Sequence, residues 1–308
     1  MSLEPVGYID LPPHEREGGF DHAAVHNPSG RLYVAHTAND AVDVVDTREN
    51  RYVRSISGLR EVAGALVSDE RGLVFTSNRG EDTVAVFPEG DTATPTKIKV
   101  GVRPNGLAFD PKRNMLLAAN VGDPAKPETH TVTLVDVARG VIFANPRVPG
   151  RTRWAIFDAA TDRFFVNVRE PPTIVVLEAG EPTGIAATFP VPAAGPHGLD
   201  LERAQRRLFC ACDDRTLLVL SLPDGRIIHR RALTGPPDVV TFNPAKRRLY
   251  VAIGDPGVID VFDTGTMERL ESRATEKGAH TIACDPQTGR IFAFLPATHR
   301  AVVFADEG

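Results

Sequence analysis

Three of the nine histidines fall at one position of a sequence repeat. The repeat is a short apolar run that ends in an Asp/Asn-Pro-like turn and is followed by a β-rich run. It returns seven times, at intervals of roughly 41 to 48 residues. Its first position, whose occupants we call the register residues, reads His22, Gly64, Asn105, Arg153, His197, Asp238 and His280. Three imidazoles and a carboxylate suit Zn²⁺ or another divalent transition metal, so the sequence predicts one such ion held by His22, His197, Asp238 and His280.

The predicted metal site has a chemical use. A metal ion with an open coordination position polarises a carbonyl group or acidifies a bound water. Asp238 would then act as ligand or general base, and Arg153 would anchor a carboxylate or phosphate. Asp238 and Arg153 are therefore the candidate catalytic residues. A simpler alternative is that these are solvated polar side chains, which cost little at the mouth of a water-filled channel.

A second set of polar residues ends the β-like run that follows each register residue. If the two runs pair as antiparallel strands, the end of the second lies beside the register residue. The set includes His36, Asn78 and Asn120. With Asn105 and Arg153, they are predicted to bind a small ligand at a channel mouth, where closed β folds favour ligand sites.

The elements that must position these residues are short strands. Each repeat holds four β-like segments with period-two alternation and turn signals between them, as in 31–36, 41–45 and 51–56 of the first repeat. Such a pattern favours strands over helices. Four strands in about 42 residues are typical of a propeller blade.

The sequence therefore predicts an all-β fold, a single seven-bladed β-propeller over residues 1–308. Its blades should begin near residues 20, 62, 103, 151, 195, 236 and 278. The last repeat supplies three strands, and residues 6–11 resemble the missing fourth strand. Pairing that N-terminal strand with the last blade would close the ring and leave no free edge there.

Several segments carry a family resemblance over essentially the whole chain. They are LYVAHTAND, VFTSNRGED and LLAANVGD, read with RPNGLAFDP and GPHGLDLE. These segments resemble the repeats of the YVTN-type β-propeller family and of the related seven-bladed lactonase-like propellers. The resemblance implies the propeller scaffold. It carries over no catalytic motif, because members of the YVTN family differ in function.

Composition and missing motifs exclude several functions. The formal net charge is −5, and Lys and Arg are scattered, so no nucleic-acid partner is expected. No apolar run is long enough to span a membrane. There is no phosphate loop, so no nucleotide cofactor is expected, and no nucleophile-elbow motif. We expect a monomer. The compartment stays open between cytoplasmic and, if a signal peptide was removed, periplasmic or secreted.

Three functions remain. The leading one is binding of a small ligand, assisted by one divalent metal ion, at the channel mouth. The second is a metal-dependent lactone hydrolase or lyase, which rests on analogy of fold as much as on chemistry. The third is a scaffold that binds an unknown protein partner through blade edges and loops.

Overall fold

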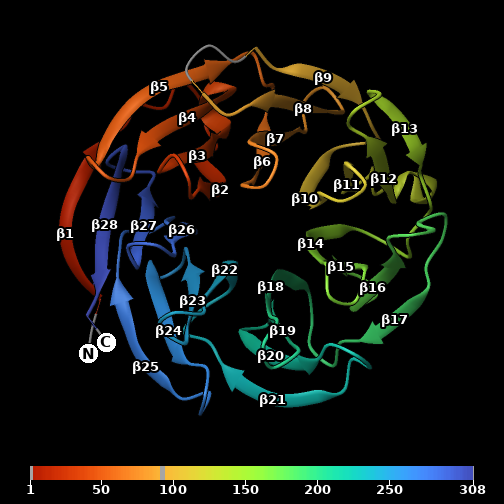
Figure 1. The fold of residues 1–308 in the computed structure, drawn as a ribbon. Helices are drawn as coiled ribbons and strands as arrows, with labels where there is room; N and C mark the ends of the chain where they lie inside the picture. The colour runs from red at the N-terminus through yellow and green to blue at the C-terminus, as the bar shows by residue number, and fades with distance from the viewer. Residues whose placement is uncertain (1–2, 91–93, 308) are drawn as a thin grey trace.

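The computed structural model describes residues 3–90 and 94–307. Seven four-stranded antiparallel sheets, each one blade of a propeller, stand around a central channel (Figure 1). The predicted all-β fold and seven blades of four strands are confirmed. Within these ranges the helical elements are two 3₁₀ turns, η1 (Thr37–Asn39) and η2 (Pro127–Thr129). No helix there is long and apolar enough to cross a membrane.

In blades one to six the strands follow chain order from the channel outward. Blade one contains β2 (Phe20–His26), β3 (Arg31–His36), β4 (Ala41–Asp46) and β5 (Arg51–Ser57). Blade two contains β6 (Val62–Ser68), β7 (Leu73–Asn78), β8 (Thr83–Pro88) and β9 (Thr96–Lys99). Blade three contains β10 (Pro104–Asp110), β11 (Met115–Asn120), β12 (Thr131–Asp136) and β13 (Val141–Ala144). Blade four contains β14 (Thr152–Asp158), β15 (Arg163–Val168), β16 (Thr173–Glu178) and β17 (Ala187–Pro190). Blade five contains β18 (Pro196–Glu202), β19 (Arg207–Cys212), β20 (Thr216–Ser221) and β21 (Ile227–Ala232). Blade six contains β22 (Pro237–Asn243), β23 (Arg248–Ile253), β24 (Val258–Asp263) and β25 (Arg269–Ala274). Blade seven contains β26 (Thr281–Asp285), β27 (Arg290–Leu295), β28 (Arg300–Asp306) and, outermost, β1 (Leu3–Asp10).

The ring is closed by the two ends of the chain. β1 pairs antiparallel with β28, from Leu3 opposite Asp306 to Asp10 opposite Arg300. The predicted closure by an N-terminal strand is thus confirmed, although the strand begins earlier than residue 6. This pairing completes the fourth strand of blade seven.

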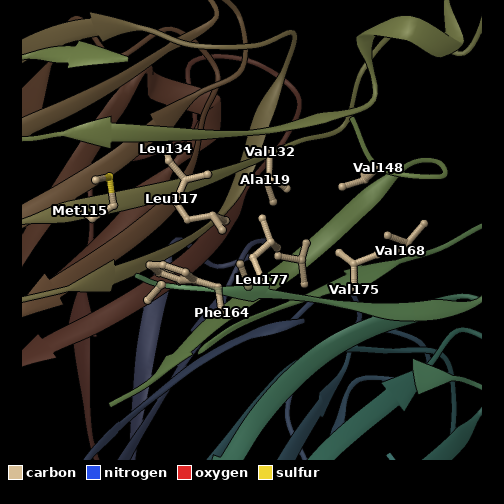
Figure 2. Packing of buried hydrophobic residues seen from close by; sticks show 14 residues of the cluster. Met115, Leu117, Ala119, Val132, Leu134, Val148, Phe164, Val168, Val175 and Leu177 are labelled. Atoms are coloured by element: carbon tan, nitrogen blue, oxygen red, sulfur yellow. The ribbon is translucent and has the colours of Figure 1, made fainter. Parts of the chain in front are cut away.

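The hydrophobic core lies between the blades. Alternation along each strand sends neighbouring side chains to opposite faces of the sheet. In β11, Leu117 packs with blade four, whereas Leu116 packs with blade two. Figure 2 shows the first cluster, where Met115, Leu117, Ala119, Val132 and Leu134 of blade three meet Phe164, Val168, Val175 and Leu177 of blade four. Because burial of one such aliphatic side chain contributes roughly 1.5–3 kcal/mol, these layers hold the blades against one another.

Six of the inner strands begin with a break in their pairing. In β10 the pairing shifts between Pro104 and Leu107, so Asn105 and Gly106 lie opposite a single residue of β11. This is a β-bulge, which re-aims the side chains at its position. The bulges place residues from blades one, three, four, five and six at the channel mouth.

Glycine occupies the second bulge position in three blades because the next blade lies directly against it. A β-carbon on Gly106 would lie 2.3 Å from the carbonyl oxygen of Arg153, and one on Gly198 would lie 2.3 Å from that of Asp238. Gly64 makes the same kind of approach to blade three. Adjacent blades thus meet through their backbones beside the mouth.

We expect Gly106→Ala to destabilise the propeller. The added methyl group must displace the backbone of blade four, so the free energy of unfolding should fall by about 1–3 kcal/mol. Gly184→Ala is the matched control, because no heavy atom lies within 4 Å of its added β-carbon. Urea unfolding measures both variants. Equal stability of the two would contradict the close contact between blades.

Candidate functional site

One cavity at the channel mouth collects most of the register residues. It has a volume of about 260 Å³ and is lined by His22, Asn105, Arg153, His197, Asp238 and His280, with Gly18, Phe20, Asp21, Thr37 and Arg79. Gly64 is not among the lining residues. The structure thus brings six of the seven register residues to one place.

Strand pairing shows that the register slips by one residue in blades one and two. In blade three, Pro104 pairs with the last residue of β11, and Asn105 is the next residue. In blade one, Phe20 pairs with the last residue of β3, so the next residue is Asp21. The counterpart of Asn105 is therefore Asp21 in blade one and Ala63 in blade two. Sequence reasoning missed Asp21. The sequence does contain a pattern that points to Asp21, because positions 21, 63 and 105 are evenly spaced, 42 residues apart.

His22 occupies the second bulge position of blade one. It packs against Trp154, the one tryptophan of the chain, with ring centroids 4.0 Å apart. Burial lowers the pKa of His22, so its imidazole is neutral at neutral pH. His22 lines both the mouth cavity and a larger cavity that Trp154 also lines. The His22–Trp154 contact therefore separates two compartments of the channel.

His197 is held between two carboxylates. Its Nδ1 lies 2.8 Å from Oδ1 of Asp213, and its Nε2 lies 3.2 Å from Oδ1 of Asp238. Burial by itself lowers the pKa of His197, but the charge of Asp238 and the hydrogen bonds to both carboxylates raise it to about 9. At neutral pH the ring is therefore a cation, and neither nitrogen has a lone pair for a metal ion.

The same contacts keep both carboxylates ionised. Burial favours the neutral form of Asp213, but hydrogen bonds from His197 and Arg169 lower its pKa to about 2. The pKa of Asp238 also lies well below its usual range, against the effect of burial, because His197 and His280 are near. Asp213 was not predicted. It follows β19 in a turn, where acidic residues are common.

His280 presents a different tautomer. Its Nδ1 lies 2.7 Å from the carbonyl oxygen of Gly278, which can only accept, so Nδ1 carries the hydrogen. The lone pair of the neutral ring is then on Nε2, which lies 4.0 Å from Oδ2 of Asp238. Carbonyl-oriented imidazoles of this kind are common among metal ligands.

Arg153 differs from the other cations of the cavity. Arg79 forms a 2.7 Å ion pair with Asp21, and His197 is paired with carboxylates. In the part of the chain that the structure describes, Arg153 has no ion pair, and its buried Nε has no hydrogen-bond partner. Burial lowers the pKa of Arg153, but a guanidinium stays charged at neutral pH. On the adjoining blade, the buried Oδ1 of Asn105 also lacks a protein partner.

The second predicted set is not brought to the cavity. His36, Asn78 and Asn120 are completely buried in their own blades. Nδ1 of His36 lies 2.7 Å from a carboxylate of the same blade, and both asparagines donate to threonines of the adjacent strand. These side chains lie within the sheet layer, so of the predicted ligand-binding residues only Asn105 and Arg153 line the mouth.

The predicted metal ligands are only partly assembled. Within residues 3–90 and 94–307, no group of three or more His, Cys, Asp and Glu side chains is arranged to hold a metal ion. His197 is paired through both nitrogens, and His22 packs on Trp154. Of the four predicted ligands, Asp238 and His280 still face each other, with a carboxylate oxygen of Asp238 directed at an imidazole nitrogen of His280.

No family model matches this chain, and no curated protein shows a significant match to it. The resemblance to YVTN-type propellers therefore rests on the repeats and on the seven-bladed ring. Because unrelated functions share the propeller fold, the function must be argued from the cavity itself.

His197 should make stability depend on alkaline pH. Its pKa is about 9 in the folded chain against an ordinary value of 6.5, so its stabilising effect is complete below pH 6.5 and is lost as the pH rises through 9. The loss should be at most about 3 kcal/mol. Urea unfolding at pH 6 and pH 9.5 should show it in the wild type and much less in His197→Gln. An equal loss in both proteins would contradict the two carboxylate contacts.

Proposed function

We propose that this propeller binds a small anionic ligand, a carboxylate or a phosphate, in the mouth cavity, with Arg153 as the anchor. One observation carries the proposal. Arg153 is largely buried and forms no direct ion pair in the described chain, although the charges of Asp238, Asp213 and Asp21 act on it from a distance. A buried guanidinium is costly without a counter-charge, and carboxylates and phosphates match its donor geometry.

The rest of the cavity supports this choice of ligand. Arg151 and Arg169 lie near Arg153, and burial together with these guanidiniums lowers the pKa of Arg151 to about 10, which leaves it a cation. The carboxylates of Asp21 and Asp238 are already paired with Arg79 and His197. Arg169 is paired with Asp213, so Arg151 and Arg153 are the guanidiniums on the side of blade four that an added anion meets without an ion pair in the described chain.

The size and polarity of the cavity limit the ligand further. Its volume of about 260 Å³ lies near the lower end of ligand sites, so the ligand should be small. The buried Oδ1 of Asn105 is an acceptor without a protein partner, and it suits a hydroxyl or amine beside the anionic group.

Arg153→Gln should weaken anion binding. Inorganic phosphate and malonate are suitable probes, and fluorescence of Trp154, adjacent in sequence to Arg153, reports occupancy alongside calorimetry. A charge-assisted hydrogen bond is worth about 1.5–3 kcal/mol, so the affinity should fall by roughly tenfold or more. Arg139→Gln, an exposed arginine of a blade-three turn, is the matched control and should bind as the wild type does. Unchanged affinity in Arg153→Gln would refute the proposal.

A divalent metal ion is a second candidate ligand, favoured by the tautomer of His280. Its Nε2 lone pair and the carboxylate of Asp238 would supply two ligands, and His197 would join them only after losing its proton. A metal there would supply Lewis-acid chemistry, as a lactone hydrolase or lyase requires. In that case Arg153 would orient the anionic part of the substrate.

Metal analysis separates these candidates. Protein purified in metal-replete medium without a chelating resin should contain about one metal ion per chain if the second candidate holds, and His280→Gln should lose it. Absence of metal from the wild type would exclude a metal-dependent enzyme. If metal is present, turnover of a lactone panel that stops with chelator would identify an enzyme, and no turnover would leave a binding protein.

A further inference from the structure

The channel contains a second cavity, distinct from the mouth. Its volume is about 760 Å³, and the inner strands of all seven blades line it. It lies on the other side of the His22–Trp154 contact and extends to the turns that follow the inner strands, where Asp69 and Glu70 are exposed. Nothing in the proposed anion site uses this compartment.

Most of the residues that line this channel cavity have apolar side chains. Phe109, Trp154, Phe157, Leu66 and Ile156 are among the lining residues, although the rings of Phe109 and Phe157 also pack on phenylalanines between the blades. Its volume falls within the range of sites for drug-sized ligands, which are typically apolar with a few polar groups. The lining therefore suits an organic group that carries a ring or an alkyl chain.

The ionised groups of the cavity are mainly carboxylates. Asp69, Glu70 and Asp200 line it together with one guanidinium, that of Arg203. Arg203 is engaged elsewhere, because its Nε lies 3.4 Å from Oδ1 of Asp158. The oxygens of Asp69 accept hydrogen bonds from an asparagine, which leaves the negative charge in place. The entrance is thus acidic.

Asp200 is the carboxylate that lies on one of the inner strands lining the cavity, β18. Its two oxygens accept 2.7 Å hydrogen bonds from the backbone nitrogens of Leu201 and Phe242, on blades five and six. In the described chain it has no ion pair. Burial raises its pKa to about 6, although the two backbone hydrogen bonds and the charge of Arg203 act in the opposite direction. At pH 7.5 it is still ionised, at a cost that a bound cation would offset.

We propose that the channel cavity binds an organic ammonium ion with an aromatic or alkyl group, its ammonium directed to Asp200. The apolar group would pack among the apolar residues that line the inner strands. An anionic ligand would meet three carboxylates, and a neutral apolar ligand would leave Asp200 without a counter-charge. The ammonium therefore fits both the charge and the lining, and the inference does not depend on the anion site.

Three probes that share a phenylethyl group and differ in charge test the proposal on the intact wild-type protein. They are 2-phenylethylammonium, 2-phenylethanol and 3-phenylpropanoate, titrated at pH 7.5 with Trp154 fluorescence and calorimetry as readouts. The ammonium should bind at least tenfold more tightly than the alcohol, and the carboxylate should bind most weakly. Equal affinity of ammonium and alcohol, or no binding of the ammonium, would overturn the proposal.

A variant locates the charge. Asp200→Asn keeps the shape of the side chain and should weaken binding of 2-phenylethylammonium by about tenfold. A cooperative urea unfolding transition shows that the variant is folded. Undiminished ammonium binding by Asp200→Asn would overturn the assignment. If this variant does not fold, the comparison of the three probes on the wild type decides alone.

Discussion

The backbone contact between adjacent blades beside the channel mouth is the constraint on which the rest depends. Gly106 lies against the carbonyl group of Arg153, and Ser77 and Asn167 donate hydrogen bonds to the carbonyls of Asn105 and His197. These mouth residues are thus held through their main chains by the preceding blade. Their side chains are free to differ, so a nearly symmetric ring carries an asymmetric set of charges.

That asymmetry is visible on both sides of the His22–Trp154 contact. On the mouth side, paired carboxylates leave Arg153 as the uncompensated charge. On the other side, Asp200 is a half-buried carboxylate without an ion pair in the described chain. Desolvation makes each of these groups costly, and each cost favours a ligand of opposite sign. One channel therefore presents two chemically opposite compartments, which meet at the tilted rings of His22 and Trp154.

The repeat predicted the fold because period-two alternation and evenly spaced turns leave few alternatives to a propeller. It also placed Arg153 and Asp238 at one mouth. It took His22 in place of Asp21, because a bulge makes two successive residues equally good candidates for one position. It also could not show that His36 is enclosed within its blade, or that Asp213, in a turn, reaches back to a strand of the ring. Those facts depend on side-chain direction, which spacing does not encode.

A crystal structure of the wild type soaked in phosphate is the sharpest test of anion binding by Arg153. We expect an anion in the mouth cavity within hydrogen-bond distance of the Arg153 guanidinium, with the carboxylate contacts of His197 preserved. A fully soaked crystal with phosphate bound only at surface arginines, and none beside Arg153, would contradict it.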